Sequence, residues 1–281
     1  MKETIVSTPM FSGFMCKKEG SLKVKYFKGY ETRNESTVRM IELAIQKYQI
    51  SDFDWVVVHT GDREGPKEYD GKRVLGYATK SQCFDNVCPD FTFDHWRQTQ
   101  MEDYEATRKE LVEAGGKPPQ TGLLGWRGNV STHPSRKKIV KLDDKINFDV
   151  EGIVWNRKDP SRLICPNYVS LVDQVSRWRY LIDIEGVGWS ARLKLLFFSR
   201  RVVFVQDRPF KEWYFPRLNA WEHFVPVKRN LSDLVEKLNL VKDDQNLEDS
   251  LRNKACDFAC NYLTRDAALE RWYELLTAAQ I

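Results

Sequence analysis

The sequence predicts an α/β protein of two domains, and three observations lead to this class. The chain has 281 residues, about two ordinary domains by length. Short continuous apolar runs at residues 55–59 and 201–206 have the pattern of strands covered on both faces. In the second half such runs alternate with segments of helical periodicity, which is typical of a parallel sheet with helices on both faces. The second half is therefore predicted to be doubly wound.

The first half contains fewer recognisable elements and ends at a pair of prolines. Pro118 and Pro119 lack amide donors and are poorly accepted inside a helix or a sheet, so the domain boundary is expected there. The predicted domains are residues 1–117 and 118–281, and the last helix is free to pack back on the first. The expected elements of the first domain are helices at 35–49, capped by Asn34, and 96–114, and strands at 55–59 and 73–78.

The second domain is predicted as strand and helix in alternation, followed by helices alone. The expected strands cover residues 122–126, 148–155, 180–184, 201–206 and 225–227. The expected helices cover residues 135–145, 167–177 and 190–199, and three more begin near Leu231, Asn246 and Arg265, the last of them ending at the C-terminus.

Charge and hydropathy exclude several classes of partner. The 44 basic and 40 acidic residues give a formal charge of +4 and are interleaved, so no basic stripe for nucleic acid is present. The sequence has no run of 18 apolar residues and does not open on the pattern of a secretion signal. We expect no membrane span, a cytoplasmic location and free thiols at the six cysteines. With four histidines and no Cys-x-x-Cys pair, no zinc site is expected.

Ligands of open α/β sheets bind at the carboxyl ends of strands, so the turns after strands are where chemistry is expected. The first such turn reads Glu185-Gly-Val-Gly-Trp-Ser-Ala-Arg192. If a helix begins at Ser190, its free amides and dipole, together with Arg192, form a site for a nucleotide diphosphate. In the simpler interpretation the glycines only permit a tight turn and Ser190 only caps its helix.

Arg127 and Asp62 occupy the other two turns. Arg127 lies between two glycines after a predicted strand, where it either neutralises a leaving phosphate or is an ordinary surface arginine. Asp62 follows the strand that ends at His59 and is either a general base or a turn residue that binds its own backbone. We interpret His59 as a packing residue.

Two further patterns point to other chemistry. Asp52 and Asp54 form an Asp-x-Asp pair of the kind that binds divalent metals, but they precede their strand, which favours a turn feature. The Gly186-Val-Gly188 turn is compatible with a dinucleotide-dependent oxidoreductase. However, it comes late in its domain, and no Gly-x-Gly-x-x-Gly occurs.

Six ordered blocks carry a resemblance to a known family. They are Tyr180-Leu-Ile-Asp-Ile-Glu-Gly-Val-Gly-Trp-Ser-Ala-Arg-Leu193, Arg201-Val-Val-Phe204, Trp213-Tyr-Phe-Pro-Arg-Leu218, Trp221-Glu-His-Phe-Val-Pro-Val227, Leu231-Ser-Asp-Leu234 and Arg271-Trp-Tyr-Glu-Leu-Leu276. These blocks resemble the conserved half of glycosyltransferase family 90, which holds capsule xylosyltransferases and protein O-glucosyltransferases. Upstream, Trp126-Arg-Gly128 is similar to the family's aromatic-Arg-Gly turn, and residues 53–62 look like the strand that delivers its catalytic aspartate.

The resemblance implies a GT-B architecture, in which two Rossmann-like domains face each other across a cleft. It also implies an inverting, metal-independent transfer from a UDP-sugar, which is a co-substrate and not a cofactor. Asp62 becomes the catalytic base, and Asp85 and Phe93 lie in the acceptor-binding stretch. The residues that would bind the donor are Arg127, Val187, Gly188, Trp189, Ser190, Ala191 and Arg192.

The chain also departs from the family pattern. Asn129-Val130-Ser131 stands where many members have a second arginine, and the signal and retention segments of the protein O-glucosyltransferases are missing. The sequence is more similar to the algal-virus xylosyltransferases that decorate capsid glycans, which would place it in the host cytoplasm. The expected reaction is transfer of xylose from UDP-xylose to a hydroxyl of an oligosaccharide or glycoprotein. A UDP-glucose-dependent O-glucosyltransferase and a non-catalytic sugar-nucleotide-binding module are the alternatives.

Overall fold

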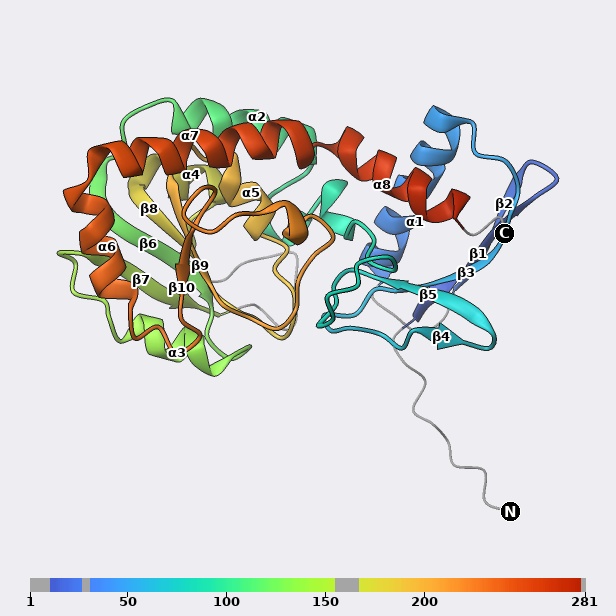
Figure 1. Cartoon of the computed structure of the whole chain (residues 1–281), viewed down its shortest axis with the longest axis horizontal. Helices are drawn as coiled ribbons and strands as arrows, with labels where there is room; N and C mark the ends of the chain where they lie inside the picture. The colour runs from blue at the N-terminus through green and yellow to red at the C-terminus, as the bar shows by residue number, and fades with distance from the viewer. Residues whose placement is uncertain (1–10, 27–30, 155–166, 279–281) are drawn as a thin grey trace, which may run out of the picture. The chain divides into compact units, whose positions relative to one another are not determined.

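The computed structural model describes residues 11–26, 31–154 and 167–278, and these divide into two compact units (Figure 1). Unit 1 comprises Met1–Asp94, Pro209–Trp213 and Arg265–Ile281, and unit 2 comprises His95–Arg208 and Tyr214–Thr264. Each unit carries one five-stranded sheet. The predicted α/β class is confirmed.

The sheet of unit 1 has the order β2-β1-β3-β5-β4 and is mixed. Its strands are β1 (Phe11–Lys18), β2 (Ser21–Tyr26), β3 (Phe53–His59), β4 (Glu68–Tyr69) and β5 (Lys72–Gly76). Only β3 and β5 run parallel, while the pairs β1–β2, β1–β3 and β4–β5 are antiparallel. The hairpin of β1 and β2 was not expected from the sequence. The one parallel pair therefore brings the carboxyl ends of β3 and β5 to the same edge.

Two helices from opposite ends of the chain pack together in unit 1, α1 (Glu31–Tyr48) and α8 (Arg265–Thr277) (Figure 1, blue and red). The buried residues include Ile41 on α1 and Trp272 on α8. The expectation that α1 is capped by Asn34 is wrong, because the helix begins three residues earlier. The Asn34 amide is instead buried and accepts a hydrogen bond of 3.1 Å from Thr60 Oγ1 at the end of β3.

The sheet of unit 2 is parallel throughout, as predicted, with the order β10-β9-β8-β6-β7. Its strands are β6 (Thr121–Asn129), β7 (Phe148–Ile153), β8 (Trp178–Asp183), β9 (Val202–Gln206) and β10 (Val225–Val227). Trp155, the end of one expected strand, lies outside the described residues. A continuous apolar core covers the sheet and includes Trp126, Tyr180 and Phe204.

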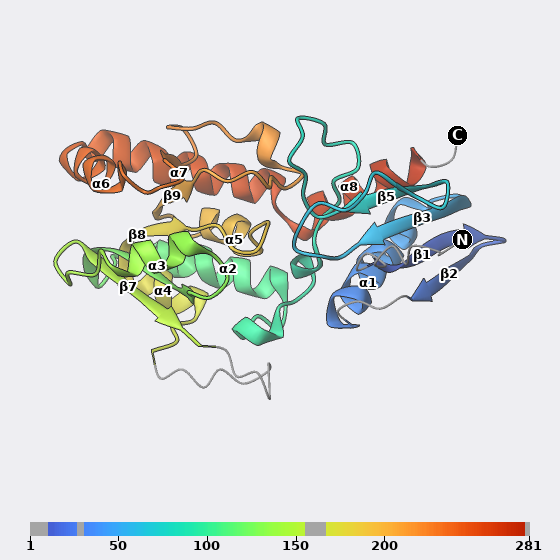
Figure 2. The same ribbon diagram turned by 90° about the horizontal axis from the view of Figure 1, so that it is seen from below.

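The helices of unit 2 lie on both faces of its sheet. They are α2 (Tyr104–Gly115), α3 (Pro134–Val140), α4 (Leu171–Arg177), α5 (Leu193–Phe197), α6 (Leu234–Asp243) and α7 (Gln245–Tyr262). The order of the strands reverses after β7: β7 is added on one side of β6, whereas β8 and β9 are added on the other side. Right-handed crossovers therefore place α3 on one face and α4 and α5 on the other (Figures 1 and 2). This reversal is the point where doubly wound sheets bind ligands.

Four of the predicted helices are shorter in the structure, namely those expected at 96–114, 135–145, 167–177 and 190–199. The helix expected at 96–114 begins only at Tyr104, because Asp103 caps it by accepting from the amide of Ala106 at 2.8 Å. The helix expected at 190–199 is reduced to α5, and the residues before it form turns. Ser190 therefore does not cap a helix.

The end of α2 is fixed to unit 2 by one buried guanidinium. Arg201 donates to the carbonyl oxygens of Gly115 at 2.9 Å, Lys117 at 2.7 Å and Val175 at 3.0 Å. Burial lowers the pKa of Arg201 to about 10. These bonds hold residues 95–117 in unit 2, although the paired prolines placed the boundary after them.

Five cysteines in the described residues are free, namely Cys16, Cys83, Cys88, Cys256 and Cys260, and Cys165 lies outside that part of the chain. None of the helices in the described ranges is long and apolar enough to cross a membrane.

Candidate functional site

The carboxyl ends of β8 and β9 bring together a cluster of charged side chains in unit 2. Asp183, the last residue of β8, is fully buried and forms an ion pair with Arg208, which follows β9. Ser190 Oγ donates to Asp183 Oδ1 at 2.8 Å, and Arg192 Nε lies 3.6 Å from the same oxygen. Burial opposes ionisation, yet the Arg208 and Arg192 guanidiniums hold the pKa of Asp183 below its usual value.

Arg192 connects this cluster to β6. Its Nη1 donates to the carbonyl oxygen of Arg127 at 2.8 Å, and its guanidinium carbon lies 5.9 Å from the ring centroid of Trp126. Burial lowers the pKa of Arg192 below its usual value. The predicted donor residues Ser190 and Arg192 therefore meet at one carboxylate.

Arg136 on α3 completes the cluster and was not predicted. Its guanidinium donates to the carbonyl oxygens of Glu185 at 2.9 Å, Ile184 at 3.2 Å and Asn129 at 3.2 Å. Burial, with the charge of Arg192 beside it, lowers the pKa of Arg136 to about 10. The signal in the sequence was its place at the start of the helix after β6, where helices of such sheets contact ligands.

The turn between β8 and α5 closes around these arginines. A Cβ added at Gly186 would lie 3.1 Å from Arg136 Nη2, so a glycine permits this close approach. Val187 is 41% exposed, whereas Gly188 and Trp189 are buried. Ala191 is half-buried. Of the predicted donor segment, Val187 is therefore the residue most open to solvent.

The cluster carries a positive excess. Glu185, its second carboxylate, is held by Arg229 through two hydrogen bonds of 3.0 and 3.1 Å. The single negative charge of Asp183 is outnumbered by three guanidiniums, those of Arg136, Arg192 and Arg208. Desolvated guanidiniums in excess over carboxylates suit an anion such as a diphosphate.

Arg127 does not join this cluster through its side chain, contrary to its predicted place in an open turn. It lies inside β6 and is buried, with Nη2 at 2.8 Å from Asp149 Oδ1 and the guanidinium 4.9 Å from the ring centroid of Trp178. Although burial acts against it, hydrogen bonds from Lys145, Arg127 and Trp178 lower the pKa of Asp149 to about 2. In this structure Arg127 braces β6 against β7.

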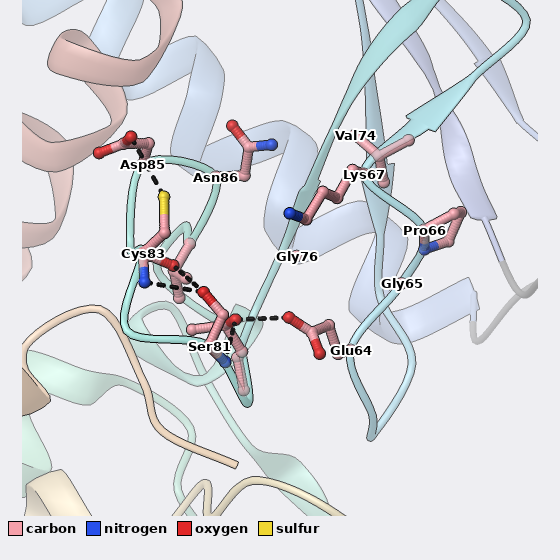
Figure 3. A pocket seen from close by; sticks show the side chains of 13 residues that line it. Glu64, Gly65, Pro66, Lys67, Val74, Gly76, Ser81, Cys83, Asp85 and Asn86 are labelled. Atoms are coloured by element: carbon pink, nitrogen blue, oxygen red, sulfur yellow. Dashed lines mark hydrogen bonds between the residues drawn. The ribbon is translucent and has the colours of Figure 1, made fainter. Parts of the chain in front are cut away.

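Unit 1 contains a cavity of about 160 Å³ between the loops that follow β3 and β5 (Figure 3). Seven of its lining residues are polar, namely Glu64, Lys67, Thr79, Ser81, Cys83, Asp85 and Asn86. The Glu64 carboxylate accepts a short hydrogen bond from Thr79, which connects the two loops. The cavity therefore offers both hydrogen-bond donors and acceptors, as the recognition of a polyhydroxylated ligand requires.

The two predicted carboxylates of unit 1 have different surroundings. Asp62 is bound by Arg33, with 3.0 Å between Oδ1 and Nη2, and it is not among the residues that line the cavity. Asp85 lines the cavity and accepts a hydrogen bond of 3.2 Å from Cys83 Sγ (Figure 3). Phe93 is fully buried against the ring of Trp213, at 6.2 Å between centroids, and does not line the cavity either.

His59 and Asp52 are explained by packing and turn geometry. A Cβ added at Gly61 or Gly65 would lie 2.6 or 2.7 Å from the His59 imidazole, so the turn after β3 wraps this ring closely. Asp52 accepts from the amides of Glu19 and Gly20 at 2.6 and 3.2 Å and thereby fixes the β1–β2 turn. Within the described residues no group of three or more metal-ligating side chains occurs.

The fold and the charged strand ends define a class of protein, one with two α/β units and a cluster of guanidiniums at the strand ends of a parallel sheet. Residues 20–279 match the model of one family, described as Glycosyl transferase family 90, and the chain belongs to that family. Its two α/β units agree with the GT-B class that the sequence predicts.

Similar curated proteins carry the names of sugar transferases. Protein O-glucosyltransferase 1 of Rattus norvegicus is 27% identical over 222 residues, which are 73% of this chain and 56% of that protein. Protein O-glucosyltransferase 3 of Homo sapiens is 35% identical over 218 residues, 74% of this chain and 41% of that protein. Uncharacterized protein 179R of Invertebrate iridescent virus 6 is 23% identical over 263 residues, which are 83% of this chain and 21% of that protein. The chain spans about half the length of the O-glucosyltransferases it matches.

Solved structures overlap the chain only loosely. TarM covers 57% of this chain with a TM-score of 0.42 at 13% sequence identity, and 36% of that chain is matched. A glycosyltransferase from Rickettsia africae covers 90% of this chain and 84% of its own, with a TM-score of 0.40 at 10% identity.

Proposed function

We propose that this chain is an inverting, metal-independent glycosyltransferase that moves xylose from UDP-xylose to a hydroxyl of a glycan acceptor. The observation that carries the proposal is the guanidinium cluster at the carboxyl ends of β8 and β9. Departure of UDP from an anomeric carbon develops negative charge on the β-phosphate, which fixed cationic donors offset without a metal. Loss of one such donor typically costs ~2.7–4 kcal/mol of barrier.

The base is proposed to come from unit 1. The resemblance favours Asp62, which follows β3, and Asp85 lies on the loop after the parallel neighbour β5. Asp62 would have to give up its ion pair with Arg33 before it could take a proton. Asp85 lines the cavity, but its carboxylate points away from the cavity in Figure 3. We therefore propose Asp62 as the base and Asp85 as a residue that binds the acceptor.

The donor sugar has two candidates. Xylose follows from the resemblance to capsid-glycan xylosyltransferases, and glucose is supported by the names of the curated relatives. The two sugars differ by one hydroxymethyl group, so a pocket that accepts glucose has room for xylose, whereas a pocket fitted to xylose can exclude glucose. Oligosaccharides and glycoproteins remain the proposed acceptors.

Calorimetry of UDP binding in EDTA tests the donor site. We expect Arg192→Ala to weaken UDP binding about tenfold or more, because a charge-assisted hydrogen bond contributes ~1.5–3 kcal/mol. Arg179→Ala is the matched control, since Arg179 lies at the amino end of the same strand β8, where it pairs with Glu248 at 2.8 Å. An Arg192→Ala variant with the affinity of the wild type would refute the assignment, as would equal losses in both variants.

A further inference from the structure

The loop that carries Asp85 is held by an arginine of the neighbouring strand. Arg73 on β5 donates through Nε to Asn86 Oδ1 and through Nη2 to the carbonyl oxygen of Asp85, each at 2.6 Å. Its Nη1 also lies 3.4 Å from the carbonyl oxygen of Leu275 on α8. The guanidinium therefore stands between the loop and the C-terminal helix.

A second arginine reaches the same loop from α8. Arg271 donates through Nη2 to the carbonyl oxygen of Phe84 at 2.7 Å and through Nε to that of Val87 at 3.2 Å. The same Nη2 lies 3.4 Å from the carbonyl oxygen of Asp85. Together the two guanidiniums bind an acceptor on each of the residues 84–87, although Arg271 is about 185 residues away in the sequence.

This arrangement brings two like charges close to one carbonyl group. Burial, together with the charge of Arg271, lowers the pKa of Arg73 below its usual value. Arg271 has a carboxylate partner on its own helix, Glu274, at 2.8 Å. That carboxylate is half exposed and is no part of the contact with the loop, so the loop contact and the ion pair can be separated by mutation.

We propose that Arg271 is a positioning residue, which fixes the backbone of residues 84–87 and with it the wall of the cavity that Asp85 and Asn86 form. The C-terminal helix α8 thereby becomes part of the acceptor site. The proposal rests on the proposed function in one respect, that the cavity of unit 1 receives the acceptor. Cys83, which donates to Asp85 Oδ2, lies on the same loop and reports on its geometry.

The test compares Arg271→Ala, Arg271→Lys and Glu274→Gln in the full chain. Cys83 and Cys260 are both exposed. The rate of alkylation of Cys83 by iodoacetamide, divided by that of Cys260, therefore reports how the loop exposes Cys83, with Cys260 as a reference in the same molecule. Amide exchange of residues 84–88 provides a second probe, because the amides of Val87 and Cys88 bond within this region. Neither probe needs a substrate.

We expect Arg271→Ala to change the Cys83-to-Cys260 ratio at least threefold and to speed amide exchange roughly tenfold, as the loss of charged hydrogen bonds predicts. The KM for the acceptor should rise about tenfold, because the displaced loop forms a wall of the cavity, with kcat and the KM for the donor unchanged, since the donor cluster is in unit 2. Arg271→Lys should lie between Arg271→Ala and the wild type, because an ammonium keeps the charge but lacks the planar fork with which Nε and Nη2 reach two separate carbonyl groups. Glu274→Gln should resemble the wild type in every readout.

Unchanged loop probes in Arg271→Ala would overturn the positioning role, and so would a Glu274→Gln variant as impaired as Arg271→Ala. If Arg271→Ala fails to fold, the comparison of Arg271→Lys with Glu274→Gln decides in the same way. A wild-type chain that transfers no sugar would defeat the proposed function, while the loop probes would still decide what Arg271 does.

Discussion

At the residue scale, several side chains in or near the predicted site are explained by packing. His59 is the last residue of β3 and Asp62 follows three residues later, yet one is enclosed by two glycines and the other is bound by Arg33. Their residue types alone are those of acid–base chemistry. Which role each takes depends on side chains from distant parts of the sequence, such as Arg33, that the local pattern does not contain.

The buried imidazole of His59 makes a measurable prediction about stability. Burial lowers the pKa of His59 from the usual 6.5. Below that pH the unfolded chain binds more protons than the folded chain, so the free energy of unfolding should fall as the pH drops, by at most about 1.4 kcal/mol per pH unit for one group. Well above pH 6.5 the contribution of His59 to the free energy of unfolding should no longer change with pH.

Urea denaturation between pH 7.5 and 5 measures this dependence. His59→Gln should show a shallower fall than the wild type. Some dependence should remain, because burial also lowers the pKa of His133 and of His223. Identical slopes for the variant and the wild type would show that His59 does not contribute.

At the element scale, the sequence predicts unit 2 better than unit 1. Buried parallel strands are continuous apolar runs, and β10 agrees with its expected residues 225–227. The β1–β2 hairpin was missed because its turn uses Glu19 and Gly20, both with positive φ, where only the glycine is a usual turn signal. The helix expected from Ser190 was predicted too long because the side chain of Ser190 bonds to Asp183 and not to a helix amide.

Some site residues that follow a correctly predicted strand could be placed from the sequence, and the others could not. Ser190 and Arg192 follow β8 as predicted, and their meeting at Asp183 was not predicted. Arg136 and Arg208 were missed, because their proximity depends on the order of strands in the sheet. Arg127 was expected in a turn, but β6 continues to Asn129 and takes its side chain into the sheet.

The loops after β3 and β5 can be compared by one pair of variants. Asp62→Asn should lower kcat by roughly 10² to 10⁴, the usual contribution of a general base, with UDP affinity unchanged. Asp85→Asn should retain kcat and raise mainly the KM for the acceptor, because Asp85 lines the cavity. Steady-state UDP release measures both. An active Asp62→Asn beside an inactive Asp85→Asn would contradict these assignments.

At the scale of the whole molecule, the chain combines two units that serve different partners of one proposed reaction. Unit 2 holds guanidiniums in excess at the ends of parallel strands, which suits an anionic donor. Unit 1 holds a polar cavity lined by the carboxylates Glu64 and Asp85 among other polar residues, which suits a hydroxyl acceptor. Membership of glycosyl transferase family 90 joins these two observations.

The most direct measurement is transfer by the wild-type chain in EDTA, with UDP-xylose and UDP-glucose supplied separately to oligosaccharide acceptors. Mass spectrometry of the acceptors should show a mass increase of one pentose from UDP-xylose, together with UDP release, and addition of manganese should leave the rate unchanged. UDP binding without any product from either donor would contradict a catalytic role, and transfer only after addition of manganese would contradict a metal-free site.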